Sequence, residues 1–416
     1  MSDRIKWVNA LSNRPSLEAA IAEVSATVRE SLSGDPDLGI VFISAAYASE
    51  YPRLVPLLLE KLPLKTLIGC GGGGVVGLGD RGDSMEIEGN PALSLSVASL
   101  PDVRVRPFHL VGKTLPDLDS PPNRWSELIG VDPQEKPSFI LLADPFSSQI
   151  TDLLQGLDFA YPTSIKVGGL ASSGAMAGQN GLFYYDAENS DKSLYREGTV
   201  GVALSGAITV NAIVAQGCRP IGQTFQVTQG QRNVILQIAE YNQTAGEEES
   251  QPTLTALRNL LQTLDESDRE LAQHSLFVGL ARDEFKADLN QGDFLIRNLI
   301  GVDPKVGAVA IGDRVRPGQR LRFHLRDAKT SEEDLEVLLR RYQREQSNPE
   351  GAIGALMFSC LGRGEGLYGK PNFDSRLFQR YLGNIPVGGF FCNGEIGPVG
   401  SSTFLHGYTS VFAIFY

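Results

Sequence analysis

The sequence predicts a mixed α/β protein of two similar halves, built from repeated strand–helix–strand units and antiparallel strands, with glycine-rich loops at strand ends. Three apolar runs each lead into a glycine-rich stretch, at residues 68–74, 167–174 and 387–394. Each stretch follows another apolar run by about 30 residues, the length of one strand–helix–strand unit with its crossover. Between these units, segments such as residues 92–100 alternate apolar and polar side chains, as antiparallel strands with one wet face do.

Composition excludes several classes of protein. The 416 residues carry a formal net charge of −12, which argues against a nucleic-acid interface and against binding to anionic membranes. The sequence contains no run of about 18 apolar residues, so no membrane span is predicted, and its first residues lack a signal-peptide pattern. The four cysteines form no C-x-x-C pair, which excludes zinc-knuckle and thioredoxin motifs and favours a reducing compartment. We therefore expect a cytoplasmic protein.

A helical lead-in is expected in residues 1–38, before the first of two domains. Its apolar residues recur every three or four positions, Ser16 is a suitable N-cap and Gly34 a suitable stop. The first repeated unit follows, and its helix, from Tyr51 to Leu62, contains Pro56. A proline at this position predicts a late start or a kink.

The first domain is expected to span residues 39–216. Residues 114–137 are rich in proline and aspartate and predict a surface loop. The second repeated unit runs from Phe139 to Gly174. Residues 181–185 and 199–204 flank a polar turn and predict a hairpin.

The second domain is expected to span residues 217–416. Helices are predicted near residues 253–264 and 331–344, and the second of these has acidic residues at its start and arginines at its end, which complements the helix dipole. The third repeated unit occupies residues 351–400. The last apolar run, residues 408–416, predicts a strand built into the core.

Two nucleotide-binding patterns occur by spacing alone. Gly69, Gly71 and Gly74 match G-x-G-x-x-G, but the residues that follow do not predict the helix that a dinucleotide site needs. Residues 364–370 match G-x-x-x-x-G-K, but Pro371 replaces the serine or threonine that would bind magnesium. A glycine loop over a pocket explains this segment better, and no cofactor or metal is expected.

Charged and nucleophilic residues gather after the last two apolar runs of the third unit. Arg363 lies in a glycine loop, and its guanidinium suits a carboxylate or phosphate. Glu395 lies in the next loop, so the two could bind a zwitterion such as an amino acid or could pair with each other. Cys360 or Cys392 with His406 could alternatively form a nucleophile and base, although buried cysteines are usually small hydrophobes.

The motifs after residue 350 resemble the C-terminal part of the FIST domain family. They are Cys360-x-x-Arg363-Gly364, Pro386-Val387-x-Gly389-Phe390 and Gly394-Glu395-Ile396-Gly397-Pro398, followed by His406 and Thr409. The strand and glycine pattern from Gly39 to about Ala215 is similar to the family's N-terminal part. The first loop departs from the family, because it is almost all glycine where serine or threonine is more common, and should offer only backbone groups.

The resemblance implies a sensory protein of signal transduction that binds small ligands such as amino acids or related carboxylates. No kinase, cyclase, methyl-accepting region or F-box is evident, so a stand-alone, non-catalytic sensor with an unknown signalling partner is expected. A cysteine-dependent enzyme and a protein-interaction scaffold remain alternatives. The expected ligand-binding residues are Arg363, Glu395, Gly394, Cys360, Cys392, His406, Thr409, Gly69, Cys70, Gly168, Gly169, Ser172 and Ser173.

Overall fold

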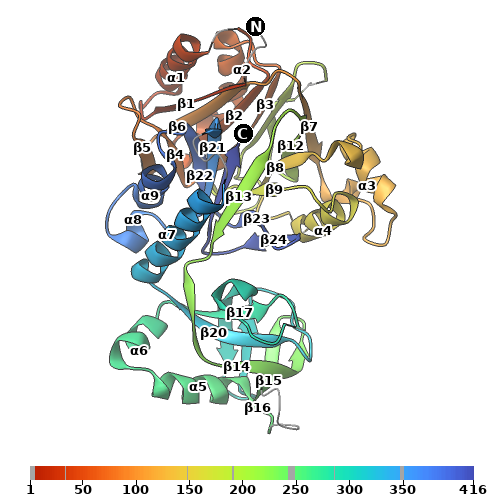
Figure 1. Ribbon diagram of the computed structural model, residues 1–416, viewed down its shortest axis with the longest axis vertical. Coiled ribbons are helices and arrows are strands. Elements are labelled where there is room, and N and C mark those ends of the chain that lie inside the picture. Colours follow the sequence, from red (N-terminus) through yellow and green to blue (C-terminus); the bar gives the residue numbers. More distant parts are fainter. Residues whose placement is uncertain are drawn as a thin grey trace. The chain divides into compact units, whose positions relative to one another are not determined.

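The computed structural model describes residues 5–32, 34–147, 149–189, 192–241, 249–284, 286–346 and 351–416. They form two compact units, one of Met1–Ala215 with Glu336–Tyr416 and one of Gln216–Leu335. The mixed α/β class, with repeated strand–helix–strand units and antiparallel strands, is confirmed (Figure 1). All three strand–helix–strand units lie in the first compact unit.

The first sheet contains the N-terminal strands. Its order is β1 (Lys6–Ser12), β6 (Leu93–Ser99), β2 (Leu38–Ser44), β3 (Thr66–Gly72), β10 (Leu182–Asp186) and β11 (Leu194–Tyr195). Only β2 and β3 run parallel, and the 3-10 helix η1 (Ala45–Glu50) and helix α2 (Tyr51–Lys61) connect them. Helix α1 (Leu17–Ser31) joins β1 to β2, and the Ser16 hydroxyl accepts the Ala19 amide as the predicted N-cap.

The second and third sheets repeat this plan. The second has the order β7 (Val103–Leu110), β12 (Thr199–Gly206), β8 (Ser138–Ala143), β9 (Lys166–Leu170), β23 (Glu395–Val399) and β24 (Ser402–His406), with α3 (Pro122–Ile129) and α4 (Ile150–Ala160). The third has the order β13 (Val210–Ala215), β25 (Ser410–Phe415), β21 (Gly354–Cys360), β22 (Val387–Cys392), β4 (Gly74–Leu78) and β5 (Ser84–Glu88), with α8 (Glu365–Tyr368) and α9 (Phe373–Leu382).

The three sheets are related as a threefold repeat. In each, the third and fourth strands are the parallel pair: β2 and β3, β8 and β9, β21 and β22. The strand after each glycine loop leaves its own sheet and pairs with the fourth strand of another, β4 with β22, β10 with β3 and β23 with β9. Each glycine loop therefore carries the chain from one sheet into another, and the three loops link the three sheets in a cycle.

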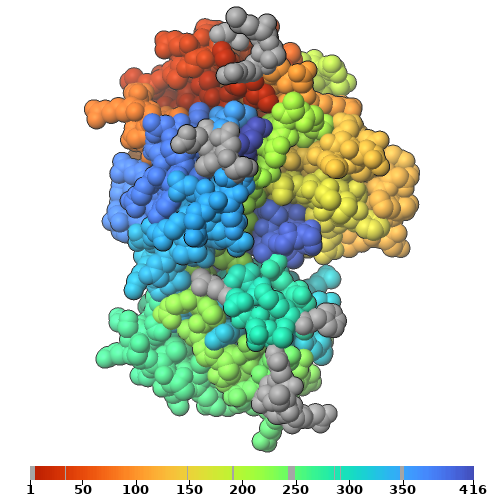
Figure 2. Space-filling view, viewed as in Figure 1, coloured from red at the N-terminus to blue at the C-terminus, as the bar shows by residue number. Residues whose placement is uncertain are grey.

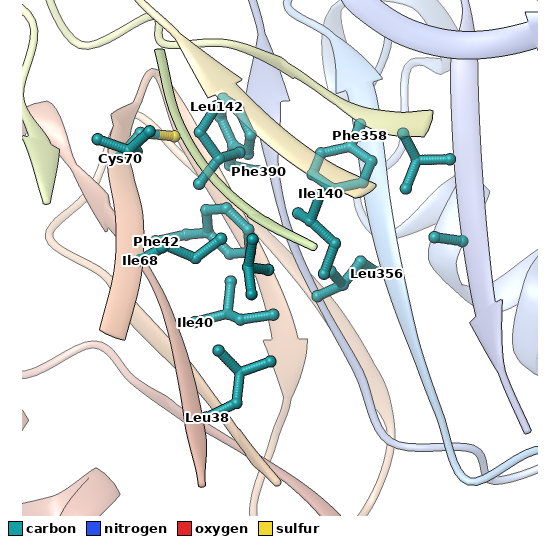
Figure 3. Packing of buried hydrophobic residues seen from close by; sticks show 14 of the residues in the cluster. Leu38, Ile40, Phe42, Ile68, Cys70, Ile140, Leu142, Leu356, Phe358 and Phe390 are labelled. Carbon is teal, nitrogen blue, oxygen red and sulfur yellow. The ribbon is translucent and has the colours of Figure 1, made fainter. Parts of the chain in front are cut away.

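One hydrophobic core lies between the three sheets. It contains Phe42 and Cys70 from the first sheet, Leu142 from the second, and Phe358 and Phe390 from the third (Figure 3). The opposite faces of the parallel strands pack against helices, which explains why these strands are apolar on both faces. In Figure 2 the red N-terminal surface adjoins the blue C-terminal surface, as this shared core requires.

Three local predictions were wrong. Helix α2 does not start late: it begins at Tyr51, because Pro52 occupies its first turn, and Pro56 lies inside it. The expected loop at residues 114–137 contains helix α3, whose Trp125 and Ile129 are buried, so tertiary packing outweighs the proline-rich composition. The expected hairpin does not form, because β10 and β12 belong to different sheets.

The second compact unit is a closed antiparallel barrel. Its strands follow the order β14 (Cys218–Gln231), β20 (Arg320–Arg326), β17 (Leu276–Ala281), β18 (Phe294–Asp303), β19 (Ala308–Ile311) and β15 (Val234–Glu240), and β15 pairs back with β14. The short strand β16 (Gln251–Pro252), helix α5 (Thr253–Thr263), helix α6 (Glu266–Ala272) and the start of α7 (Ala328–Glu345) belong to the same segment. The second compact unit has its own hydrophobic core.

Candidate glycine-loop site

The three glycine-rich loops meet at one place in the first unit. We call the residues 69–74, 168–174 and 388–394 the glycine-loop junction. The Ser172 hydroxyl accepts the Gly73 amide at 2.9 Å and donates to the carbonyl oxygen of Phe391, so one side chain bridges all three loops. The Ser172 amide donates to Gly71, and the Leu170 amide donates to Gly394. The carboxyl ends of three parallel pairs, the usual ligand edge of such sheets, therefore converge.

Gly69 and Gly168 have a structural reason to be glycine. A Cβ at Gly69 would overlap the carbonyl oxygen of Val41, its partner on the parallel strand, and a Cβ at Gly168 would overlap that of Leu141. Gly389 has the same relation to Met357 in the third sheet. These predicted site residues set the spacing of the parallel strands, whatever else they do.

Polar side chains surround the second loop. The Tyr51 hydroxyl donates to the Ser44 carbonyl and shares a hydrogen bond with Ser173. Burial raises the pKa of Tyr51 to about 12, so it stays a neutral donor at physiological pH. Ser173 and Ser172 are half-buried, so both hydroxyls lie near the surface of the molecule.

One acidic and one basic side chain contact Asn180, which accepts the Ser173 hydroxyl at 3.4 Å. Asn180 accepts the Gly174 amide at 2.9 Å and lies 3.4 Å from a carboxylate oxygen of Asp144. Burial raises the pKa of Asp144, which is 3% exposed. Arg196 lies over the Tyr51 ring at 5.8 Å and donates to the carbonyl oxygen of Asn180. The arrangement offers hydroxyls, an amide and both signs of charge within one neighbourhood.

The third repeat places the remaining predicted residues close together. Glu395 begins β23, pairs with Gly169 on one side and with His406 on the other, and accepts the Thr409 amide at 3.1 Å. In the other two repeats the equivalent positions are Val75 and Leu182, both of which lie in the core. A buried carboxylate thus replaces an apolar side chain in one repeat of three.

The predicted thiols lie in the same region. Cys360 and Cys392 are partners at the ends of β21 and β22, and Cys70 lies in the same core as Cys392. Burial, and then the charges of Glu395, Cys70 and Cys360, raise the pKa of the Cys392 thiol well above its ordinary value. The Cys392 thiol therefore stays protonated at neutral pH, which argues against it as the primary nucleophile of a cysteine-dependent enzyme. His406 is buried, with Nε2 3.0 Å from the carbonyl oxygen of Gly397.

Arg363 is held by a carboxylate that the sequence analysis did not single out. Its side chain forms a two-pronged ion pair with Asp374 of α9, at 2.6 Å and 3.0 Å, and donates to the Tyr368 hydroxyl. Both members of the ion pair are at most 1% exposed. The arginine therefore anchors the loop after β21 to the start of α9.

A second buried carboxyl group adjoins this ion pair. Glu86 of β5 accepts the Ser375 amide at 2.7 Å, and the Glu86 amide donates to the Asn372 side chain. Burial, and then the charge of Asp374, raise the pKa of Glu86 to about 7. Neither Glu86 nor Asp374 could be recognised from the sequence, because each is identified only by its burial and by contacts with residues of other elements.

The two nucleotide-like motifs do not form nucleotide sites here. The first glycine loop leads into strand β4 instead of a helix. At residues 364–370 the Glu365 amide donates to a carboxylate oxygen of Glu88, where a phosphate cradle would need an anion from a ligand. Among the described residues, no group of three or more His, Cys, Asp or Glu side chains could hold a metal ion. In the same part of the chain, no helix is long and apolar enough to span a membrane.

Comparison with known proteins finds similar sequences over nearly the whole chain. The FIST N domain family model matches residues 37–240 and the FIST C domain model matches residues 254–398. An uncharacterised protein of Mycobacterium tuberculosis is 33% identical over 409 residues, covering 97% of this chain and 98% of its own. One from Mycobacterium bovis is 31% identical over 405 residues, 96% of each chain. Human F-box only protein 22 is 31% identical over 104 residues, 24% of this chain and 25% of its own.

Proposed function

The chain belongs to the FIST family, whose domains are generally sensory domains in signal transduction, and from this premise we propose that it binds a small ligand at the glycine-loop junction. The observation that carries the proposal is the convergence of the three loops on Ser172. A ligand that contacts one loop there would alter hydrogen bonds that hold the other two. Binding would thus change the contacts between three sheets at once. A sensor needs such a structural response to its ligand.

The proposed ligand is an amino acid or a related carboxylate. Half-buried Ser173, the neutral Tyr51 hydroxyl and the Asn180 amide supply hydrogen bonds, and Asp144 and Arg196 supply one charge of each sign. Such a set suits a small zwitterion better than a purely apolar or purely anionic molecule. We propose that the response passes to a separate signalling protein and that no covalent chemistry on the ligand is involved.

The test is ligand-induced stabilisation of the full chain. Native mass spectrometry of the gently purified protein comes first, followed by thermal unfolding with amino acids and related carboxylates. A ligand that binds only the folded state adds about 2.7 kcal/mol at a free concentration of about 100 times Kd, which should raise the melting temperature by several degrees. A bare mass and a flat screen would favour the protein-interaction scaffold.

A pair of serine variants locates the site. Ser173→Ala should reduce the ligand-induced shift in melting temperature, because it removes a hydroxyl at the junction. Ser99→Ala is the matched control, since Ser99 is also partly exposed but ends β6 beside the opposite ends of the parallel strands. Equal shifts in both variants would place the ligand elsewhere.

A further inference from the structure

Two thiols end neighbouring parallel strands in the third sheet. Cys360 is the last residue of β21, Cys392 is the last residue of β22, and the two are partners in the register of the strands. Neighbouring strands lie about 4.8 Å apart. Disulfides join cysteines whose Cα atoms are about 4.4–6.8 Å apart. The backbone therefore needs little movement to bring the two sulfurs into bonding range.

The two side chains also lie on the same face of the sheet. Phe358 and Phe390, two residues earlier on the same strands, are likewise partners, and their ring centroids are 6.0 Å apart in the central core. Side chains two positions apart in a strand point to the same face. The charge of Cys360 is, moreover, one of the groups that raise the pKa of Cys392.

The two cysteines differ in exposure. Cys360 is partly exposed, and the residue after it, Leu361, is 44% exposed, so this end of β21 lies at the surface. The Gly362 amide lies 3.3 Å from Cys360 Sγ and donates to it, which stabilises the thiolate. Cys392 is buried beside it. The pair thus combines one accessible thiol with one sheltered thiol.

The fold does not require this pair. In the threefold repeat the equivalent positions are Ser44 with Gly72 in the first sheet and Asp144 with Ala171 in the second. Two of the three repeats therefore close the same junction without any thiol at these positions. A pair of cysteines in one repeat alone indicates a chemical role of its own.

We propose that Cys360 and Cys392 form an oxidation site that closes to a reversible disulfide on reaction with hydroperoxides. The Cys360 thiolate attacks the peroxide, so an S–O bond forms, the O–O bond breaks and an alcohol, or water from hydrogen peroxide, leaves. Cys392 sulfur then attacks the resulting sulfenic acid, so the S–S bond forms and the S–O bond breaks. Its proton leaves with the departing hydroxide as water. Two thiols lose two electrons, and the peroxide gains them.

Closure of the disulfide would act directly on the third glycine loop. The Leu361 amide donates to the Cys392 carbonyl, and the carbonyl of the preceding residue, Phe391, accepts the Ser172 hydroxyl that bridges the loops. Oxidation would therefore be communicated to the junction through two existing hydrogen bonds. This chemistry is independent of whether a small ligand binds there.

The direct test is peroxide treatment of the reduced full-length protein, followed by digestion and mass spectrometry without reducing agent. We expect loss of two hydrogen atoms from the intact mass and one linked peptide pair containing Cys360 and Cys392, both reversed by dithiothreitol. A link between Cys70 and Cys392, over-oxidation of Cys360 without a link, or an unreactive protein would each overturn the proposal.

Two variants separate the roles of the thiols. In Cys392→Ser, the oxidised Cys360 has no partner to resolve it, so dimedone should label Cys360 as the sulfenic acid. Cys218→Ser is the matched control, since Cys218 is a buried cysteine of the barrel unit, and it should form the disulfide as the wild type does. Circular dichroism checks that both variants fold, and a folded Cys392→Ser protein without dimedone labelling would contradict the proposed order of steps.

Discussion

Gly69, Gly168 and Gly389 occupy the same position in three sheets and face the same obstacle, a carbonyl oxygen on the parallel partner strand. A side chain there cannot be accommodated by rotating a neighbouring rotamer, because the obstacle is backbone. Each parallel pair of the repeat therefore depends on one glycine. This reason for the residue type does not depend on any ligand.

Gly389→Ala should lower the free energy of unfolding by about 1–3 kcal/mol or more, because the new Cβ overlaps the Met357 carbonyl. Gly366→Ala is the control, since a Cβ there meets no atom within 4 Å. Urea denaturation of both variants measures the difference. Equal stability of the two would show that the parallel strands can separate to admit a methyl group.

Arg363 has a partner in the structure, Asp374, that its sequence context does not indicate. Its sequence context predicts that it contacts a ligand or pairs with Glu395. The structure buries it against Asp374. Removing one member of a buried ion pair leaves the other charge without compensation.

Arg363→Met and Asp374→Leu should each lower the free energy of unfolding by about 3–5 kcal/mol, and the double variant should lose much less than their sum. Arg341→Met tests a surface pair for comparison, because Arg341 and Glu345 are 64% and 61% exposed, and it should cost less than about 1 kcal/mol. Chemical denaturation of the wild type, the two single variants and the double variant gives the coupling energy. Additive single effects would mean that Arg363 is stabilised by other groups.

Glu86 should make stability depend on pH near neutrality. Its pKa is raised to about 7 by burial and by Asp374, so the folded state keeps a proton that the unfolded state releases. The stability from this group is complete below its ordinary pKa and is lost as pH rises through about 7. Asp374, Glu88 and both the amide and the side chain of Ser375 act on its pKa.

Glu86→Gln should therefore become more stable relative to the wild type as pH rises between about 5 and 8, since glutamine keeps an acceptor for the Ser375 amide and does not ionise. Urea unfolding at several pH values measures this difference. A constant difference across the range would show that Glu86 titrates at its ordinary pKa.

At the scale of elements, the sequence predicts the local units but not the sheet that each strand joins. The three strand–helix–strand units and their loops could be predicted, because apolar runs and glycine clusters are local signals. The sheet to which β4, β10 or β23 belongs could not, because each strand pairs with residues remote in sequence. The same limit applies to the site: Arg363 could be identified, but its partner Asp374 depends on how α9 docks.

Helix α3 illustrates a second limit. Its eight residues begin with proline and lie in a stretch of turn-forming composition, so propensity alone favours a loop. Trp125 and Ile129, four positions apart, are both buried against the second sheet. Here a short apolar face is sufficient to form a helix because the sheet supplies the surface that covers it.

At the scale of the whole molecule, the barrel is an insertion into the repeat. Between the first and third strands of the first and second sheets the chain contributes α1 or α3. In the third sheet the same connection contains the whole barrel before α7. The barrel has its own core, which includes Phe225, Val278 and Leu321.

Residues 216–335 should consequently fold when expressed alone. The barrel strands pair with one another in a closed sheet, and the barrel core contains no residue of the threefold repeat. Circular dichroism should show strand-rich structure, and urea should unfold the fragment in one cooperative transition. The full chain measured in parallel provides the reference signal. A fragment without a cooperative transition would show that the barrel depends on the rest of the chain.

The repeat has three equivalent junctions between neighbouring sheets, and short turns join the strands at two of them. Turns of three residues, 100–102 and 207–209, link β6 to β7 and β12 to β13. Strands β25 and β1 occupy the corresponding places, and the rings of Phe415 and Trp7 stack with centroids 4.5 Å apart. The three repeats are thus arranged in a cycle, and the same sheets could form if the chain were opened at another of the three junctions. A circular permutant that joins β25 to β1 and opens at 207–209 should keep the same sheets.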